Sequence, residues 1–163
     1  MLYGNKTVIA DGELSSISAV VSSLPVGYTL GEERMYDGDL YRLMYNACNQ
    51  QINTGYLVAR NLGSCAAAGP YSVTVSTTTE VNQTVCGLVK HVTATTGTYF
   101  WALTETMDNP AAVSTVTAIG STGVFVHPAA NGVITNGTTT ACIGYSVAGA
   151  KFHLSLEKKS YNV

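Results

Sequence analysis

Three histidines are the first residues to test for chemistry, because an imidazole can act as a base or bind a metal. They are His91, His127 and His153, and no two are spaced to share one metal ion. His91 falls at an expected strand end, His127 where a strand leaves for a turn, and His153 on the outer face of the last expected strand. We therefore expect structural histidines, not ligands or bases.

Two pairs of carboxylates are the next candidates. Asp37 and Asp39 flank Gly38 and offer oxygens to calcium, but the further acidic ligands of a calcium loop are missing. Asp37-Gly38 is instead typical of a turn before a strand. Glu105 and Asp108 have no adjacent base, and Asp-Asn-Pro at 108–110 is typical of a loop. The sequence predicts neither a metal site nor a catalytic pair.

The motifs of nucleotide and acyl chemistry are also missing from the sequence. It contains no phosphate-binding loop, dinucleotide fingerprint or nucleophile elbow. The Gly-rich stretch 120–123 links two expected strands and opens no helix, so the helix dipole that holds a phosphate is not expected there. We expect no cofactor, no small-molecule substrate and no enzymatic activity.

Four cysteines have two possible interpretations. Their spacings are long and irregular, without a Cys-x-x-Cys pair, at Cys48, Cys65, Cys86 and Cys142. Residues 1–6 lack the pattern of a secretory signal, which favours synthesis in a reducing cytoplasm and free, buried thiols. The alternative is disulfides that form by oxidation after release from the cell.

Length and charge limit the classes of function. The chain has 163 residues, the size of one domain, with eight basic and ten acidic residues and a net charge of −2. No basic run exceeds Lys158-Lys159, so nucleic acid is not an expected partner. No apolar stretch reaches the roughly 18 residues of a membrane-spanning helix, so no membrane is expected either.

The segment 61–156 holds only five formal charges, at Glu80, Lys90, Glu105, Asp108 and Lys151. One interpretation is a surface kept in solution by neutral Thr, Ser and Asn side chains. The other is a surface that faces further protein chains, because interface cores are depleted in charge. The composition leaves both open.

Residues 1–26 differ from the rest and predict an N-terminal arm. The run 7–10 indicates a strand or an extended segment. Asp11 can cap a short amphipathic helix that begins near Glu13 and ends before Pro25. Apolar residues recur along it at helical spacing, at Leu14, Ile17, Val20 or Val21, and Leu24.

From residue 27 to residue 163 the pattern predicts an all-β domain. Gly, Asn and Asp punctuate short β-branched and aromatic runs, which is typical of an antiparallel β-barrel or sandwich. Residues 32–34 are expected in a solvated loop. Strands are expected near 39–47, 55–60, 70–77, 84–93, 98–105, 112–119, 123–127, 132–135, 140–147 and 150–157.

Three of these strands allow a prediction about their faces. In 39–47 both faces carry apolar residues, so both are expected to be covered. Tyr99 and Trp101 are expected on one face of their strand and Phe100 on the other. In 150–157 the alternation places Phe152 and Leu154, with Leu156, inward, and the residues between them outward.

The tyrosines are concentrated early in the chain and also have two interpretations. Five of them can form a belt at a protein interface, since Tyr is amphipathic and enriched at contacts: Tyr28, Tyr36, Tyr41, Tyr45 and Tyr56. The alternative is a stacking platform for sugars. A platform for bases would need accompanying Arg or Lys.

The order of these motifs resembles a known family. Residues 31–47, with an Asp-Gly turn leading into an aromatic strand, and 51–58, with the step I-x-x-G-x-L-V, resemble the start of tailed-bacteriophage head decoration (cement) proteins. Residues 96–104, 118–126 and 142–148 are similar to later strands of that family. The likeness spans about residues 27–157, although the segment 105–110 replaces the family's usual Gly-Pro pair.

The resemblance implies a β-tulip-like fold and a capsid decoration protein without catalytic activity. Such proteins bind the outer surface of an assembled head, commonly as homotrimers on the major capsid protein, which implies a virion protein made in the host bacterial cytoplasm. We expect neighbour contacts from Val8 and Ile9 as an added strand, or from Leu14, Ile17, Val21 and Leu24 in a groove. We expect Tyr41, Tyr45, Tyr99 and Trp101 to hold the core or the trimer together.

The alternative function is a receptor- or carbohydrate-binding β domain of a phage tail or fibre. It predicts an exposed aromatic side chain beside Asn, Asp or His in a loop, and the segment 127–131 is the nearest candidate.

Overall fold

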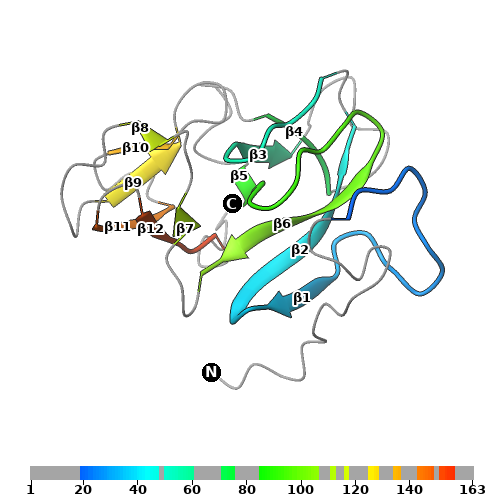
Figure 1. Cartoon of the computed structure of the whole chain (residues 1–163), viewed down its shortest axis with the longest axis horizontal. Helices are drawn as coiled ribbons and strands as arrows, with labels where there is room; N and C mark the ends of the chain where they lie inside the picture. The colour runs from blue at the N-terminus through cyan, green and yellow to red at the C-terminus, as the bar shows by residue number, and fades with distance from the viewer. Residues whose placement is uncertain are drawn as a thin grey trace, which may run out of the picture.

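The computed structural model describes residues 19–47, 50–60, 71–75, 85–106, 111–112, 116–117, 125–128, 134–136, 143–148 and 151–156. These residues form twelve β-strands and no helix (Figure 1). The expected all-β class is therefore confirmed for the described part of the chain, and a sandwich-like arrangement is compatible with it. Nothing in this part forms a helix long and apolar enough to cross a membrane.

The strands form two six-stranded sheets. The first has the order β1 (Glu33–Tyr36), β2 (Asp39–Asn46), β4 (Ser72–Val75), β3 (Leu57–Arg60), β5 (Val85–Leu88) and β6 (Tyr99–Glu105), and β2 also pairs with β6. The second has the order β7 (Ala111–Ala112), β12 (Lys151–Leu154), β11 (Gly144–Ala148), β9 (Phe125–Pro128), β10 (Ile134–Asn136) and β8 (Val116–Thr117).

Most neighbouring strands are antiparallel, as expected, but two pairs are parallel. These are β2 with β4 and β8 with β10. A parallel pair needs a crossover connection rather than a hairpin. Turn signals in the sequence predict hairpins, so they could not predict these two pairings.

The hairpin of β1 and β2 confirms the expected turn and corrects the expected loop. Asp37 and Gly38 both have positive φ, 48° and 78°, as a tight hairpin turn requires. This turn pairs the residues on both sides of it, and Glu33 and Arg34 lie opposite Arg42 and Tyr41. The solvated loop predicted at 32–34 is therefore wrong for residues 33 and 34. These charged residues belong to a strand because the hairpin turn places them opposite β2.

Buried side chains form two clusters on opposite faces of the first sheet. The shared core joins both sheets and contains Tyr41, Leu43, Leu57, Val85, Leu88, Trp101, Leu103, Val126, Ile143, Phe152 and Leu154. The first-sheet core contains Met44, Ile52, Val58, Val73, Cys86, Val89, Ala94, Phe100 and Ala102. The two-sided burial predicted for residues 39–47, and the split between Trp101 and Phe100, are confirmed.

The two sheets meet where β6 ends and β12 ends. Thr106 N donates to Leu154 O at 3.0 Å, and Leu156 N donates to Thr104 O at 3.1 Å. The alternation predicted for the last strand is confirmed over Lys151–Leu154, because Phe152 and Leu154 are buried while Lys151 is exposed. It is wrong for Ser155, which was expected to face outward but has a buried hydroxyl oxygen. This junction brings side chains of β6, β11 and β12 together.

The helix predicted to reach Leu24 is wrong over the described residues 19–24. Val21 instead forms an isolated bridge to Tyr99, with Val21 N donating to Tyr99 O at 3.2 Å and Tyr99 N donating to Val21 O at 2.8 Å. The β-branched Val20-Val21 pair and the Ser22-Ser23 pair that follows it disfavour a helix. Residues 11–18 of the predicted helix lie outside the described residues.

Cys86 is a free and buried thiol. Its Sγ lies 3.6 Å from Val58 O, and burial raises the pKa of the thiol to about 12. For this residue the prediction of a buried free thiol is confirmed, while Cys48, Cys65 and Cys142 lie outside the described residues.

Candidate interaction surface

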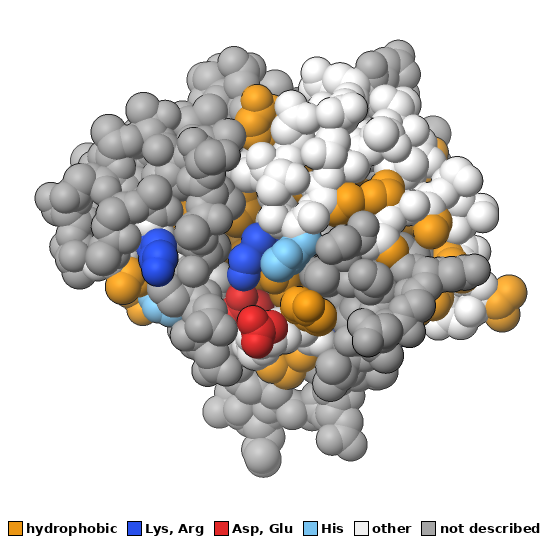
Figure 2. All heavy atoms as spheres, in the orientation of Figure 1, with side chains coloured by type: hydrophobic (Ala, Val, Ile, Leu, Met, Phe, Trp, Pro, Cys, Tyr) orange, Lys and Arg blue, Asp and Glu red, His pale blue; other side chains and the backbone are white. Residues whose placement is uncertain are grey.

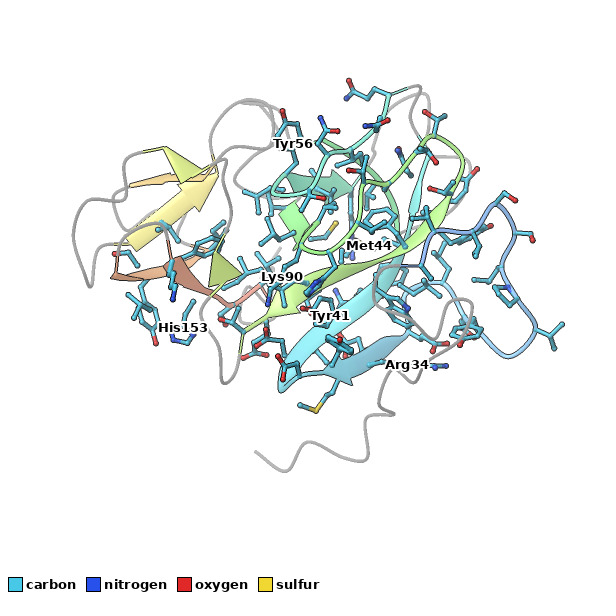
Figure 3. The ribbon with its side chains drawn as sticks, viewed as in Figure 1. Arg34, Tyr41, Met44, Tyr56, Lys90 and His153 are labelled. Carbon is cyan, nitrogen blue, oxygen red and sulfur yellow. The ribbon has the colours of Figure 1, made fainter. Side chains whose placement is uncertain are left out.

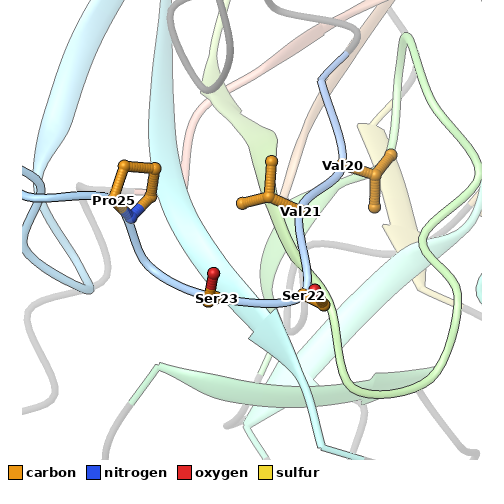
Figure 4. A pocket seen from close by; sticks show the side chains of 5 residues that line it. All are labelled: Val20, Val21, Ser22, Ser23 and Pro25. Carbon is orange, nitrogen blue, oxygen red and sulfur yellow. The ribbon is translucent and has the colours of Figure 1, made fainter.

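The segment 19–25 lies beside the start of β6 and is bonded to it at Tyr99. Besides the two backbone hydrogen bonds to Tyr99, Val21 and Leu24 pack against the shared core. Figure 4 shows the open depression along this segment, which is lined by Val20, Val21, Ser22, Ser23 and Pro25. Two of the residues expected to reach a neighbour, Val21 and Leu24, are thus used to attach the segment to its own domain.

Tyr45 and Tyr99 form a half-buried aromatic pair next to this segment. They face each other across β2 and β6, with ring centroids 4.8 Å apart and planes inclined by 43°. Both side chains keep part of their surface exposed. Because each is partly apolar and partly polar, the pair is suited to a contact with another chain.

Tyr41 and Trp101 occupy the shared core and are almost completely buried. Of the two roles expected for the four aromatics, core packing therefore applies to these two. Tyr45 and Tyr99 are the two of the set that remain accessible.

Arg34 covers the outer side of Trp101, a role that the sequence did not reveal. Its guanidinium lies 4.4 Å from the centroid of the Tyr28 ring and 5.6 Å from that of Trp101, while Tyr28 meets Trp101 edge to face at 6.4 Å. Arg34 Nε also pairs with a carboxylate oxygen of Glu32. Stacking of a cation on two aromatic rings stabilises this part of the fold.

A second polar cluster contains Tyr41, His91, Lys90 and Asp39. Tyr41 and Lys90 are labelled in Figure 3. Tyr41 Oη lies 2.9 Å from His91 Nε2, and Lys90 Nζ lies 3.1 Å from Asp39 Oδ2. The Tyr36 ring meets both Tyr41 and His91 edge to face. Each polar end named here has a partner within the cluster.

The electrostatics of this cluster indicate a structural role. Burial, assisted by Asp39, raises the pKa of Tyr41 far above its usual range, so Tyr41 keeps its proton. His91 is exposed as a whole, but its ring packs on two tyrosines, and this desolvation with the neighbouring Lys90 charge lowers its pKa. His91 Nε2 supplies the hydrogen-bond partner that the buried Tyr41 hydroxyl needs.

The remaining predicted site residues are not brought together. His153 lies in β12 and contacts Thr106 instead of another histidine. His127 lies in β9, and its side chain is outside the description. Within the described ranges no group of three or more His, Cys, Asp or Glu residues is placed to hold a metal ion. Val8, Ile9, Leu14 and Ile17 lie outside the described residues.

Comparison with protein families, with curated proteins and with solved structures found no match to this chain. Its function must therefore be argued from its own residues and their geometry.

Proposed function

We propose that this chain is a capsid decoration (cement) protein. It binds the outer surface of a phage head and holds neighbouring major capsid subunits together against the pressure of the packaged DNA. It acts by binding and not by catalysis, without a cofactor.

The observation that carries the proposal is the fixed attachment of Ala19–Pro25 to β6. A segment held by two backbone hydrogen bonds and two apolar side chains gives the chain before it a defined starting point on the domain. From that point 18 further residues span up to about 60 Å when extended. A tether of this kind raises the effective concentration of its binding residues at a neighbouring subunit.

The roles within the arm follow from this attachment. Val21 and Leu24 anchor it, while Val8 and Ile9 add a strand to a neighbour's sheet, or Leu14 and Ile17 lie in a neighbour's groove. The boundary between arm and domain then lies near residue 19 instead of residue 26.

A homotrimer completes the proposal. Tyr45 and Tyr99 supply contacts between copies, because they are accessible aromatics beside the anchored segment. The low charge of 61–156 supports a surface that is covered by other chains. We also propose that β2, β4, β3, β5 and β6, whose pairings lead back to β2, form the small barrel of a β-tulip-like domain.

The stabilising mechanism is differential affinity. A ligand stabilises the state that it binds more tightly, so a cement protein that prefers the expanded lattice opposes rupture of the head. Contacts to several subunits at once add avidity, so each contact can be modest.

Deletion of residues 1–18 tests the role of the arm. The truncated chain keeps Val21 and Leu24, so we expect it to fold, with the same unfolding midpoint as the full chain. We expect its occupancy on purified heads stripped of their decoration to fall to background. Full occupancy by the folded truncated chain would reject the arm as the binding element.

A further inference from the structure

Tyr145 is an exposed aromatic residue on the second sheet. Its side chain is 50% exposed, and Val26 is the other large apolar side chain that stands out in this way among the described residues. Tyr145 lies in β11 directly opposite His153 in β12, with ring centroids 5.1 Å apart and planes inclined by 37°. The Tyr145 ring thus packs on the His153 ring while the residue stays half exposed.

Thr106 engages one ring nitrogen of His153. Thr106 Oγ1 accepts from Leu154 N at 2.9 Å, and it lies 3.0 Å from His153 Nδ1 and 3.4 Å from Leu154 O. Nδ1 is therefore bonded within the fold in either tautomer. Nε2, the other ring nitrogen, is the one left to bond a ligand beside the Tyr145 ring.

Lys151 adds a hydrogen-bond donor on the same face of β12, two residues before His153. Lys151 is exposed, and the described part of the chain provides no carboxylate for it and no partner for the Tyr145 hydroxyl. Figure 2 shows a basic side chain (Lys or Arg), a histidine and a hydrophobic side chain close together over the second sheet.

A second cluster of Tyr, His and Lys lies beside the first sheet, and there the polar groups bond to one another and to Asp39. There Tyr41 is buried, its hydroxyl meets His91, and Lys90 is paired with Asp39. That cluster satisfies its own polar groups, whereas the cluster of Tyr145, His153 and Lys151 presents them outward.

We propose that Tyr145, His153 and Lys151 form a carbohydrate-binding subsite. The apolar face of a pyranose ring packs on the open part of the Tyr145 ring. His153 Nε2 bonds a sugar hydroxyl, and the Lys151 ammonium donates to a further hydroxyl or to the carboxylate of an acidic sugar. This role goes beyond capsid decoration and does not depend on it. A carbohydrate-binding domain was expected to have an exposed aromatic side chain beside a histidine in a loop. Tyr145 and His153 form such a pair, but on strands.

Titration of the full chain with single sugars tests the proposal by amide NMR shifts. The probes are the methyl glycosides of glucose, galactose, N-acetylglucosamine and glucuronic acid. For one ring and two polar side chains we expect a Kd of about 1–10 mM for at least one probe, with shifts at all three residues. Tyr145→Ala should weaken binding at least about tenfold, while Tyr145→Phe, which keeps the ring, changes it less than about threefold.

Val26→Ala is the matched control for loss of an exposed apolar side chain, and it should not change the sugar affinity. Absence of shifts with all four probes at about 50 mM would overturn the proposal. Equal affinity of the Tyr145→Ala chain would do so as well. If instead Tyr145→Ala abolished attachment to purified heads and no sugar bound, the cluster would be a protein contact.

Discussion

Thr106→Val offers a sharp test of the junction between the two sheets. The substitution keeps the shape of the side chain and removes the hydroxyl, which is 7% exposed as part of Thr106. That oxygen accepts from Leu154 N at 2.9 Å and lies 3.0 Å from His153 Nδ1. Valine therefore leaves a buried backbone N–H without a partner.

The expected cost follows from that unsatisfied group. A buried donor that loses its partner costs about 1–3 kcal/mol, which is roughly a 5- to 160-fold change in the folding equilibrium. In a domain of this size about 1 kcal/mol lowers the melting temperature by about 2–4 °C. We therefore expect a fall of roughly 2–12 °C for Thr106→Val.

The fluorescence of Trp101 reports both quantities, since Trp101 is the only tryptophan and is buried in the shared core. Urea unfolding gives the change in the free energy of unfolding, and thermal unfolding gives the change in melting temperature. Thr98→Val is the matched control. Its hydroxyl donates to Thr95 O at an exposed site, so we expect a change within about 0.5 kcal/mol. Equal stability of the Thr106→Val and wild-type chains would refute the assignment of Thr106 as the partner of Leu154.

Two further predictions concern backbone packing and pH. Gly144→Ala should destabilise the fold by more than about 1 kcal/mol in the same urea assay, because a Cβ at this position would overlap the carbonyl of His153; unchanged stability would contradict this close approach. The pKa of His91 is lowered in the folded chain, so the unfolded state binds the proton more tightly than the folded state does. The free energy of unfolding should therefore fall as the pH drops from 7 through about 6.5, the ordinary pKa of histidine. His91→Gln should reduce this slope between about pH 7 and pH 5, and an unchanged slope would show that other groups cause it.

Local patterns predicted much of the first sheet. The alternation in residues 39–47 separates Tyr41 and Leu43 from Met44, and the two buried clusters follow the same division. Asp37-Gly38 predicted the turn because both residues tolerate positive φ. These features depend on neighbours in the sequence, so the sequence alone contains their signal.

Long-range pairing explains what could not be predicted. The spacing of Val21 from the other apolar residues of its segment predicted a helix. Its backbone N–H and C=O instead bond to Tyr99, which lies far along the chain. Arg34 becomes a strand residue only because the hairpin places it opposite Tyr41. The outward position of His153 was predicted from alternation, but its contact with Tyr145 depends on the register of β11 and β12.

Cosedimentation of the purified full chain with phage heads tests the central claim most directly. Under the proposed function the heads are those of the phage that would encode the chain, in unexpanded and in expanded form, both free of decoration. We predict saturable binding over the whole surface of expanded heads and weaker binding to unexpanded ones. The absence of binding to either form, or attachment confined to the tail, would contradict the account.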